Sequence, residues 1–149
     1  YEAPKVRLPG AGGAPEIAAH CREVFVVMEH NSRALVPKVD FVTSLGFGPS
    51  GTEREKLGIT TKGPTLVVTD LALLQPEPGS NELVVTSLHP GVTSLHPGVT
   101  TEEIRAKTGW PVRFSPDLGQ TPAPTDTELT VLRELQERTN RAHQKAADG

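Results

Sequence analysis

Short runs of apolar, mostly β-branched residues recur along this 149-residue chain between turn-forming residues. Their length is typical of strands, and several runs are apolar at consecutive rather than alternate positions. Such runs are typical of strands that are buried on both faces of a sheet. The pattern predicts strands at residues 23–28, 39–43, 65–69, 71–75, 82–88 and 112–115.

The spacing of these runs indicates how the strands pair. The runs within 65–75 and 82–88 are separated by "PEPGSN", a turn sequence that favours an antiparallel hairpin. Continuous burial, in contrast, favours a sheet with helices on its faces. The fold class predicted is therefore α/β, an open mixed sheet covered by helices.

Three helices are predicted from their ends. Pro15 and Glu16 suit the first turn of a helix that continues through "EIAAH". Two further helices begin at capping boxes, in which a threonine is followed three residues later by glutamate. The boxes are Thr100 with Glu103, and Thr125 with Glu128.

The two capped helices differ in length. "TG" at Thr108 and Gly109 ends the first of them. The second runs to about His143, and Leu129, Leu132 and Leu135 fall along one of its faces. An apolar helix face needs cover, so we expect this last helix to be docked on the body of the domain.

A glycine-rich loop precedes the first helix, in "PKVRLPGAGGAPEIA". Glycines at positions 10, 12 and 13 let the backbone N–H groups approach a ligand closely, and a helix N-terminus attracts anions. The loop lacks the Lys and Ser or Thr of a P-loop and the third glycine of a dinucleotide fingerprint. From the pattern alone it is either an anion site or a tight turn into the helix.

Composition and charge narrow the class of protein. A formal net charge of −3 with scattered Lys and Arg gives no electrostatic footprint for nucleic acid or an anionic membrane. Residues 54–62 alternate in sign, which predicts a solvated loop or face. The single cysteine, Cys21, is expected to be a buried small hydrophobe, and one cysteine without a leader or apolar span favours the cytoplasm.

The heptapeptide "TSLHPGV" occurs at residues 86–92 and again at 93–99. Two copies are too few for a solenoid, so we interpret them as a tandem duplication whose second copy forms extra loop. The extra length costs little closure entropy. No metal site is predicted from His89 and His96, because no carboxylate or cysteine lies at ligand spacing.

Several long blocks resemble one family. "PKVRLPGAGGAPEIA", "KVDFVTSLGFG", "GPTLVVTDLALLQPEP", "ELVVTSLHPGVT" and "TEEIRAKTGWPVRFSPDL" are similar to the second half of the beta subunit of family I coenzyme A transferases, including the 3-oxoadipate and glutaconate enzymes. The resemblance runs from about residue 4 to the end of the last helix. It implies that residues 1–149 are one partial domain of the beta-subunit fold, with the N-terminal part missing.

The resemblance also implies an activity and a partner. Such enzymes pair alpha and beta subunits, as a heterodimer or heterotetramer, and transfer coenzyme A between carboxylic acids by ping-pong chemistry. A beta-subunit glutamate attacks the acyl-CoA thioester, and a glutamyl-CoA thioester then passes coenzyme A to the acceptor. The thioester is a substrate, and no permanently bound cofactor or metal is expected.

The resemblance places the catalytic glutamate in the missing part, so no catalytic residue is assigned, and Glu16 is interpreted as structural. The loop Gly10, Ala11, Gly12, Gly13 and Ala14 is expected to line the thioester site. Two alternatives stay open: a CoA-ester hydrolase on the same scaffold, and a non-catalytic fragment that acts as an interaction module.

Overall fold

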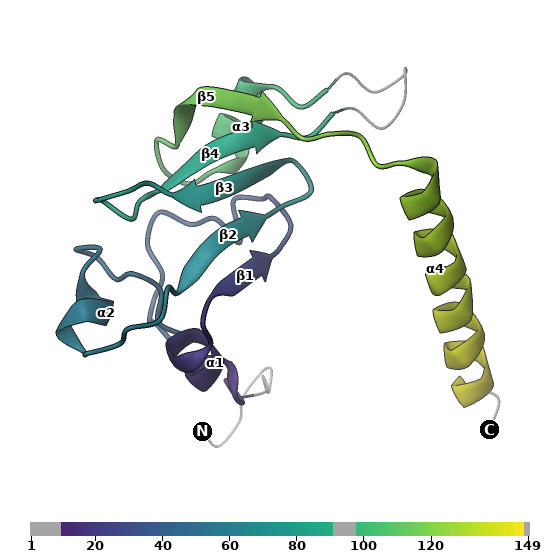
Figure 1. The fold of residues 1–149 in the computed structure, drawn as a ribbon, viewed down its shortest axis with the longest axis horizontal. Coiled ribbons are helices and arrows are strands. Elements are labelled where there is room, and N and C mark those ends of the chain that lie inside the picture. Colours follow the sequence, from purple (N-terminus) through teal and green to yellow (C-terminus); the bar gives the residue numbers. More distant parts are fainter. Residues whose placement is uncertain (1–9, 91–97, 148–149) are drawn as a thin grey trace, which may run out of the picture.

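The computed structural model describes residues 10–90 and 98–147 (Figure 1). Within these residues, five strands form one sheet in the order in which they occur along the chain. The strands β2, β3 and β4 lie close together in sequence, whereas β1 comes from an earlier segment and β5 from a later one. They are β1 (Val24–Val27), β2 (Pro64–Val68), β3 (Ala72–Pro76), β4 (Leu83–Leu88) and β5 (Arg113–Gln120).

The sheet is mixed, as predicted. β1 pairs with β2 in parallel, β3 is antiparallel to both β2 and β4, and β4 pairs with β5 in parallel. The predicted hairpin is confirmed, because β3 and β4 pair directly across residues 77–82. The carboxyl ends of β1, β2, β4 and β5 therefore meet at one edge of the sheet.

Four helices accompany the sheet in the described residues. They are α1 (Ala14–His20), α2 (Glu53–Lys56), α3 (Thr101–Lys107) and α4 (Asp126–Ala147). α3 begins at the predicted capping box, where Thr100 Oγ1 accepts from Glu103 N at 3.2 Å, and ends at Thr108. α2 was not predicted, because its four residues are too few to show a helical period.

The core lies between α3 and one face of the sheet. Ile104 of α3 is completely buried against apolar side chains of the central strands, among them Val67, Leu74 and Val85. Strand pairing places these three side chains in one row across β2, β3 and β4. The fully buried Val112, just before β5, completes the cluster.

One predicted strand is wrong. Residues 39–43 form bends and coil, and Phe41 and Val42 are exposed. A strand needs a neighbour for its backbone N–H and C=O groups, and no strand of the described sheet pairs with this segment. High strand propensity alone did not produce a strand there.

The ends of two elements also differ from prediction. β5 extends to Gln120, beyond the predicted residue 115, because Ser87 and Leu88 of β4 pair with Gly119 and Gln120. α4 continues to Ala147 but is not docked on the sheet (Figure 1). Its side chains from residue 131 to residue 144 are all exposed, so the expected docking is wrong.

Candidate functional site

The predicted glycine loop leads directly into α1. The residues Gly10, Ala11, Gly12, Gly13 and Ala14 are all exposed, and Pro15 occupies the first turn of the helix. Ala14 N donates to Ala11 O at 3.2 Å and Ile17 N donates to Gly13 O at 3.0 Å. The loop is therefore a tight turn into a helix and, at the same time, a backbone surface that is open to solvent.

The glycines of this loop are not equally constrained. Gly12 has φ +58°, a conformation that side-chain-bearing residues rarely adopt. A Cβ at Gly10, Gly12 or Gly13 would meet no atom of the described residues within 4 Å. Packing thus explains none of the three glycines, whereas backbone conformation explains Gly12.

An apolar groove lies beside the loop. It has a volume of about 300 Å³ and is bounded by Ala14, Ile17 and Ala18 of α1. The opposite wall comes from β1, the start of β2 and a coil segment: Val24, Val26, Pro64 and residues 44–46. The glycine loop and this groove are contiguous at Ala14.

Arg54 of α2 holds α1 in place. Its guanidinium donates to Ala18 O at 3.0 Å, Ala19 O at 3.4 Å and Leu45 O at 3.3 Å, and to the backbone O of Thr61 at 3.4 Å. These bonds satisfy carbonyls in the last turn of α1, which have no partner within the helix. They also join α1 to the coil segment on the other side of the groove.

Arg54 corrects the prediction of a solvated face for residues 54–62. Its side chain is buried, although most of its neighbours in this segment are exposed. A planar guanidinium with five donors can serve several carbonyls at once, which allows its burial without a carboxylate. Gly63 makes room for it, because a Cβ there would lie 2.9 Å from the Arg54 Nε.

Cys21 also differs from prediction. It is the C-cap residue of α1 and is exposed. Its backbone has left the helical conformation, with ψ 143°, so its side chain is not carried on a helix face. The predicted helix end at His20 is confirmed, whereas the predicted burial of Cys21 is wrong.

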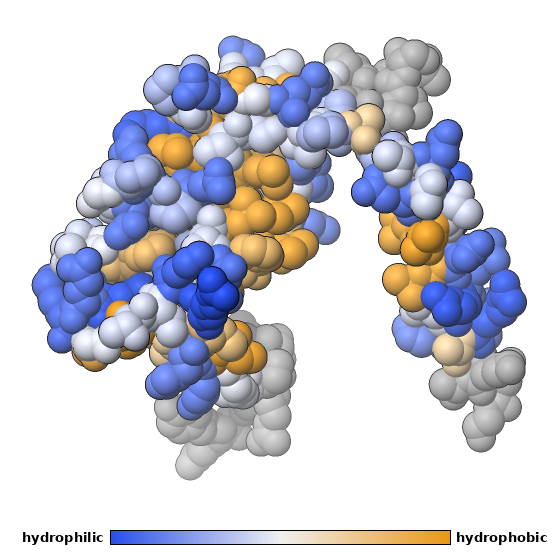
Figure 2. Space-filling model, viewed as in Figure 1, coloured by the Kyte–Doolittle hydropathy of each residue, from blue (hydrophilic) through white to orange (hydrophobic). Residues whose placement is uncertain are grey.

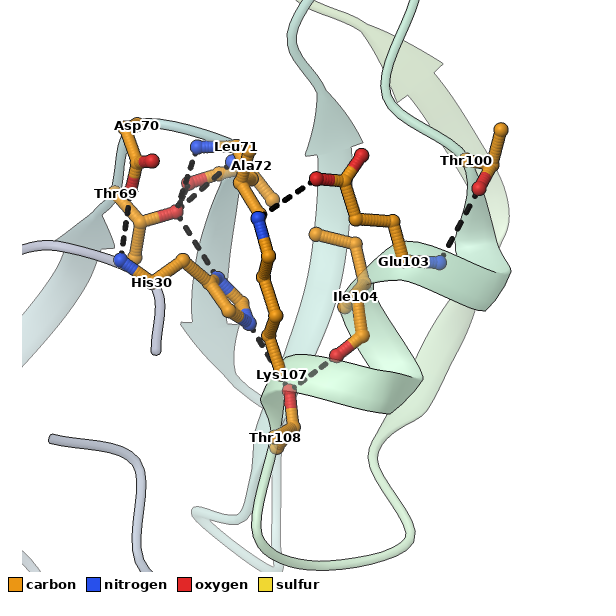
Figure 3. A network of polar contacts seen from close by, with 10 residues as sticks. All are labelled: His30, Thr69, Asp70, Leu71, Ala72, Thr100, Glu103, Ile104, Lys107 and Thr108. Carbon is orange, nitrogen blue, oxygen red and sulfur yellow. Dashed lines mark hydrogen bonds and ion pairs between the residues drawn. The ribbon is translucent and has the colours of Figure 1, made fainter. Parts of the chain in front are cut away.

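A second polar group of residues lies at the carboxyl edge of the sheet (Figure 3). The buried His30 follows β1, and its ring lies between two threonines: Nδ1 is 3.1 Å from Thr69 Oγ1 and Nε2 is 3.0 Å from Thr108 Oγ1. Its backbone N donates to Asp70 Oδ1 at 2.6 Å. His30 therefore joins β1, the β2–β3 turn and the end of α3.

Few hydrogen-bond donors are available between the His30 ring and the two threonine hydroxyls. Each threonine hydroxyl also lies within donating distance of a carbonyl, Ala72 O for Thr69 and Ile104 O for Thr108. Burial lowers the pKa of His30, against the opposing effect of the nearby Asp70 carboxylate. A neutral ring donates from one nitrogen only, so one threonine must turn its hydroxyl proton toward the ring.

His89, from the first copy of the heptapeptide, lies at the end of β4. Its Nε2 donates to the backbone O of Thr69 at 2.9 Å, and its Nδ1 is 3.0 Å from Thr121 Oγ1. Both ring nitrogens thus have protein partners. His96 and most of the second copy lie outside the described residues, and no group of three metal-ligating side chains is found within the described ranges.

Sequence reasoning missed Arg54, His30 and the threonines as structural residues. An arginine within an alternating-sign segment carries no signal of burial, and the partners of His30 lie up to 78 residues away.

Across residues 10–90 and 98–147, no helix is both long and apolar enough to cross a membrane.

Comparisons with known proteins give a consistent result. A family model described as Coenzyme A transferase matches residues 1–105. The chain is 49% identical over 96% of its length to the B subunit of 3-oxoadipate CoA-transferase from Pseudomonas knackmussii, and covers 52% of that protein. It is 33% identical to the B subunit of glutaconate CoA-transferase from Acidaminococcus fermentans, of which it covers 47%.

The solved structure of glutaconate coenzyme A-transferase from Acidaminococcus fermentans has the same fold. The TM-score is 0.74 at 29% identity, and the match covers 90% of this chain and 48% of that chain. The chain thus spans about half the length of the curated relatives it matches.

Proposed function

Since the chain belongs to the coenzyme A transferase family, we propose that it serves as part of the B subunit of an enzyme that transfers coenzyme A between carboxylic acids. The observation that carries this proposal is the 49% identity to the B subunit of a 3-oxoadipate CoA-transferase over nearly the whole chain. We propose succinyl-CoA as the CoA donor, 3-oxoadipate as the acid acceptor and an alpha subunit as the partner.

The proposed chemistry is covalent catalysis by a carboxylate. A glutamate from the part of the B subunit that this chain does not span attacks the carbonyl carbon of the acyl-CoA thioester. This attack expels the CoA thiolate and forms an acyl-glutamyl anhydride, and the thiolate then attacks the glutamyl carbonyl, which releases the donor acid and leaves a glutamyl-CoA thioester. The acceptor carboxylate takes coenzyme A from this thioester by the same two exchanges, which regenerates the glutamate. Each step passes through a tetrahedral centre whose oxygen carries negative charge, and backbone N–H groups stabilise such an oxyanion.

We assign the oxyanion or CoA-binding role to the loop Gly10, Ala11, Gly12, Gly13 and Ala14. Three properties support this assignment: the loop is exposed, no atom of the described residues lies within 4 Å of a Cβ placed on its glycines, and an apolar groove adjoins it at Ala14. The groove suits an apolar portion of the substrate, such as a pantetheine or acyl chain. Arg54 would act as a positioning residue, because it fixes α1 and therefore the loop.

A chimeric enzyme tests the proposal. This chain replaces the matching segment of the Pseudomonas knackmussii B subunit, which is produced together with its alpha subunit. Transfer of coenzyme A from succinyl-CoA to 3-oxoadipate is the expected result. Hydrolysis of succinyl-CoA without transfer would support the hydrolase instead, and an assembled but inactive chimera would favour a non-catalytic module.

Glycine substitutions in this chimera test the loop. Gly13→Val adds methyl groups where the described residues place no atom, so we expect intact folding and a loss of about 100-fold to 1000-fold in turnover. Gly12→Val should lose turnover and also stability, because of the strained backbone.

Gly58→Val is the matched control for Gly12→Val. Gly58 has φ +68° and equally open surroundings, but it follows α2. This variant should lose stability while keeping its turnover per folded molecule. Equal turnover in the Gly13→Val and unsubstituted enzymes would show that the loop serves only as a turn and does not bind the substrate.

A further inference from the structure

One face of the sheet is apolar and is not covered by any described helix. Strand pairing places Phe25 beside Leu66, Val27 beside Val68, and Val68 beside Leu73. These five residues alternate with Val26, Val67 and Leu74, which face α3, so they lie on the opposite face. We call them the open face; Phe25 and Val27 are 61% and 79% exposed.

Figure 2 shows this open face as an apolar area over β1–β3. Sheets in finished domains bury an apolar face against a second layer, because exposed contiguous apolar surface is unfavourable in water. The described helices do not provide that layer, since α3 packs on the other face and α4 stands apart (Figure 1).

The edge of the sheet next to the open face is also unprotected. β1 is the terminal strand of the described sheet, and its described backbone bonds run to the β2 side, such as Met28 N to Val68 O at 3.0 Å. Its sequence, "VFVV", contains no charge and no proline, the usual devices that prevent an edge strand from pairing further. Such an edge is suited to a further strand.

The relatives indicate which polypeptide covers these surfaces. The same sheet occurs in the solved glutaconate enzyme within a chain of which this one covers 48%. The curated 3-oxoadipate relative likewise has about as much chain outside the match as inside it. In both proteins, therefore, a second segment of similar size accompanies this sheet.

We propose that the open face and the β1 edge bind the other half of a B subunit, the segment of the relatives that this chain does not match. The contact would place apolar side chains on Phe25 and Val27 and add a strand beside β1. This inference rests on family membership and not on the proposed catalytic activity, so its test measures binding alone.

The test uses the full 149-residue chain, produced in the same cells as the unmatched half of the Pseudomonas knackmussii B subunit carrying an affinity tag. We expect the two polypeptides to copurify as a one-to-one complex, which light scattering after gel filtration would establish. Val27→Asp should weaken the complex more than about tenfold, because a carboxylate would be desolvated at the interface. Leu57→Asp is the matched control: Leu57 is similarly exposed but follows α2, and this variant should bind normally.

Circular dichroism of each variant alone checks folding, and Val27→Ser, which removes apolar area without adding charge, provides a milder second variant. An intermediate loss of binding with Val27→Ser would support the proposal. Failure to form the complex would overturn it, as would a complex that tolerates Val27→Asp. A homodimer of the unsubstituted chain that Val27→Asp dissociates would overturn it in favour of a second copy as the occupant.

Discussion

α3 and α4 begin with the same capping arrangement but differ in length and in the burial of their side chains. Each starts at a threonine whose Oγ1 accepts from the backbone N of a glutamate three residues later, at 3.2 Å in α3 and 3.3 Å in α4. α3 has seven residues and buries Ile104 completely. α4 has 22 residues, and Leu132 and Leu135 are each 50% exposed.

The difference separates two sources of helix stability. A seven-residue helix is too short to be stable alone in water, so α3 depends on packing against the sheet. α4 has enough length for local stabilisation, including the Arg141–Glu137 ion pair at 2.9 Å one turn apart. Local signals thus start both helices, whereas the sheet supports only one of them.

The largest difference in stability is expected between two substitutions that shorten an apolar side chain, one in α3 and one in α4. Ile104→Ala should lower the free energy of unfolding by about 3–5 kcal/mol, because it removes a completely buried side chain and leaves a cavity. Leu132→Ala in α4 should cost less than about 0.5 kcal/mol. Urea denaturation of both variants measures the difference, and similar losses would show that α4 is docked in solution.

A second test extends the comparison to α1, another helix of seven residues, none of them buried. Arg54→Met should cost about 2–3 kcal/mol, because it leaves the carbonyls of Ala18, Leu45 and Thr61 without a charged donor. Arg138→Met on the exposed α4 is the control and should be near neutral. A neutral Arg54→Met would mean that α1 is held in another way.

The sequence predicted elements better than it predicted contacts. Five of six strands, the hairpin and both capping boxes are confirmed, because each depends on residues close together in the chain. The segment 39–43 and the docking of α4 were wrong, since both required a partner surface that local patterning does not specify. The role of the glycine loop stays a prediction.

The buried residues of the site were beyond prediction for the same reason. Arg54 reaches carbonyls 35 and 36 residues away, and His30 reaches Thr69 and Thr108 across 39 and 78 residues. No local pattern connects such positions. The resemblance to a family supplied the fold class, but not these contacts.

A third test concerns pH, because α3 is tied through Thr108 to a titratable residue. Burial lowers the pKa of His30 below the usual 6.5 of an unfolded chain. Between pH 6.5 and the lowered pKa, the imidazole of His30 is therefore protonated in the unfolded chain and neutral in the folded protein. The free energy of unfolding should fall by up to about 1.4 kcal/mol per pH unit as the pH drops from about 6.5 toward the lowered pKa of His30. Above about pH 6.5, His30 is neutral in both states, so its protonation no longer affects the free energy of unfolding.

His30→Asn should flatten this part of the profile, which denaturation between about pH 7 and pH 5 would measure. That window lies above the ordinary pKa of the glutamates whose pKa values are lowered by hydrogen bonds, such as Glu53 and Glu128, so their protonation does not interfere. An unchanged slope in His30→Asn would exclude His30 as its source.

The smallest expected effect comes from the two caps themselves. Thr100→Ala removes the acceptor for Glu103 N and should cost about 1 kcal/mol of global stability, because α3 must form for the core to close.

Thr125→Ala removes the equivalent acceptor for Glu128 N, together with the Thr125 hydroxyl bond to Glu128 Oε2 at 2.9 Å. Its local cost is similar, but α4 unfolds independently of the sheet if nothing covers it. We therefore expect Thr125→Ala to lower helicity by circular dichroism and speed hydrogen exchange within α4, while the denaturation midpoint of the sheet shifts by a few tenths of a kcal/mol at most. Equal midpoint shifts for the two variants would show that α4 folds cooperatively with the sheet, and the contrast between these helices would then be one of exposure only.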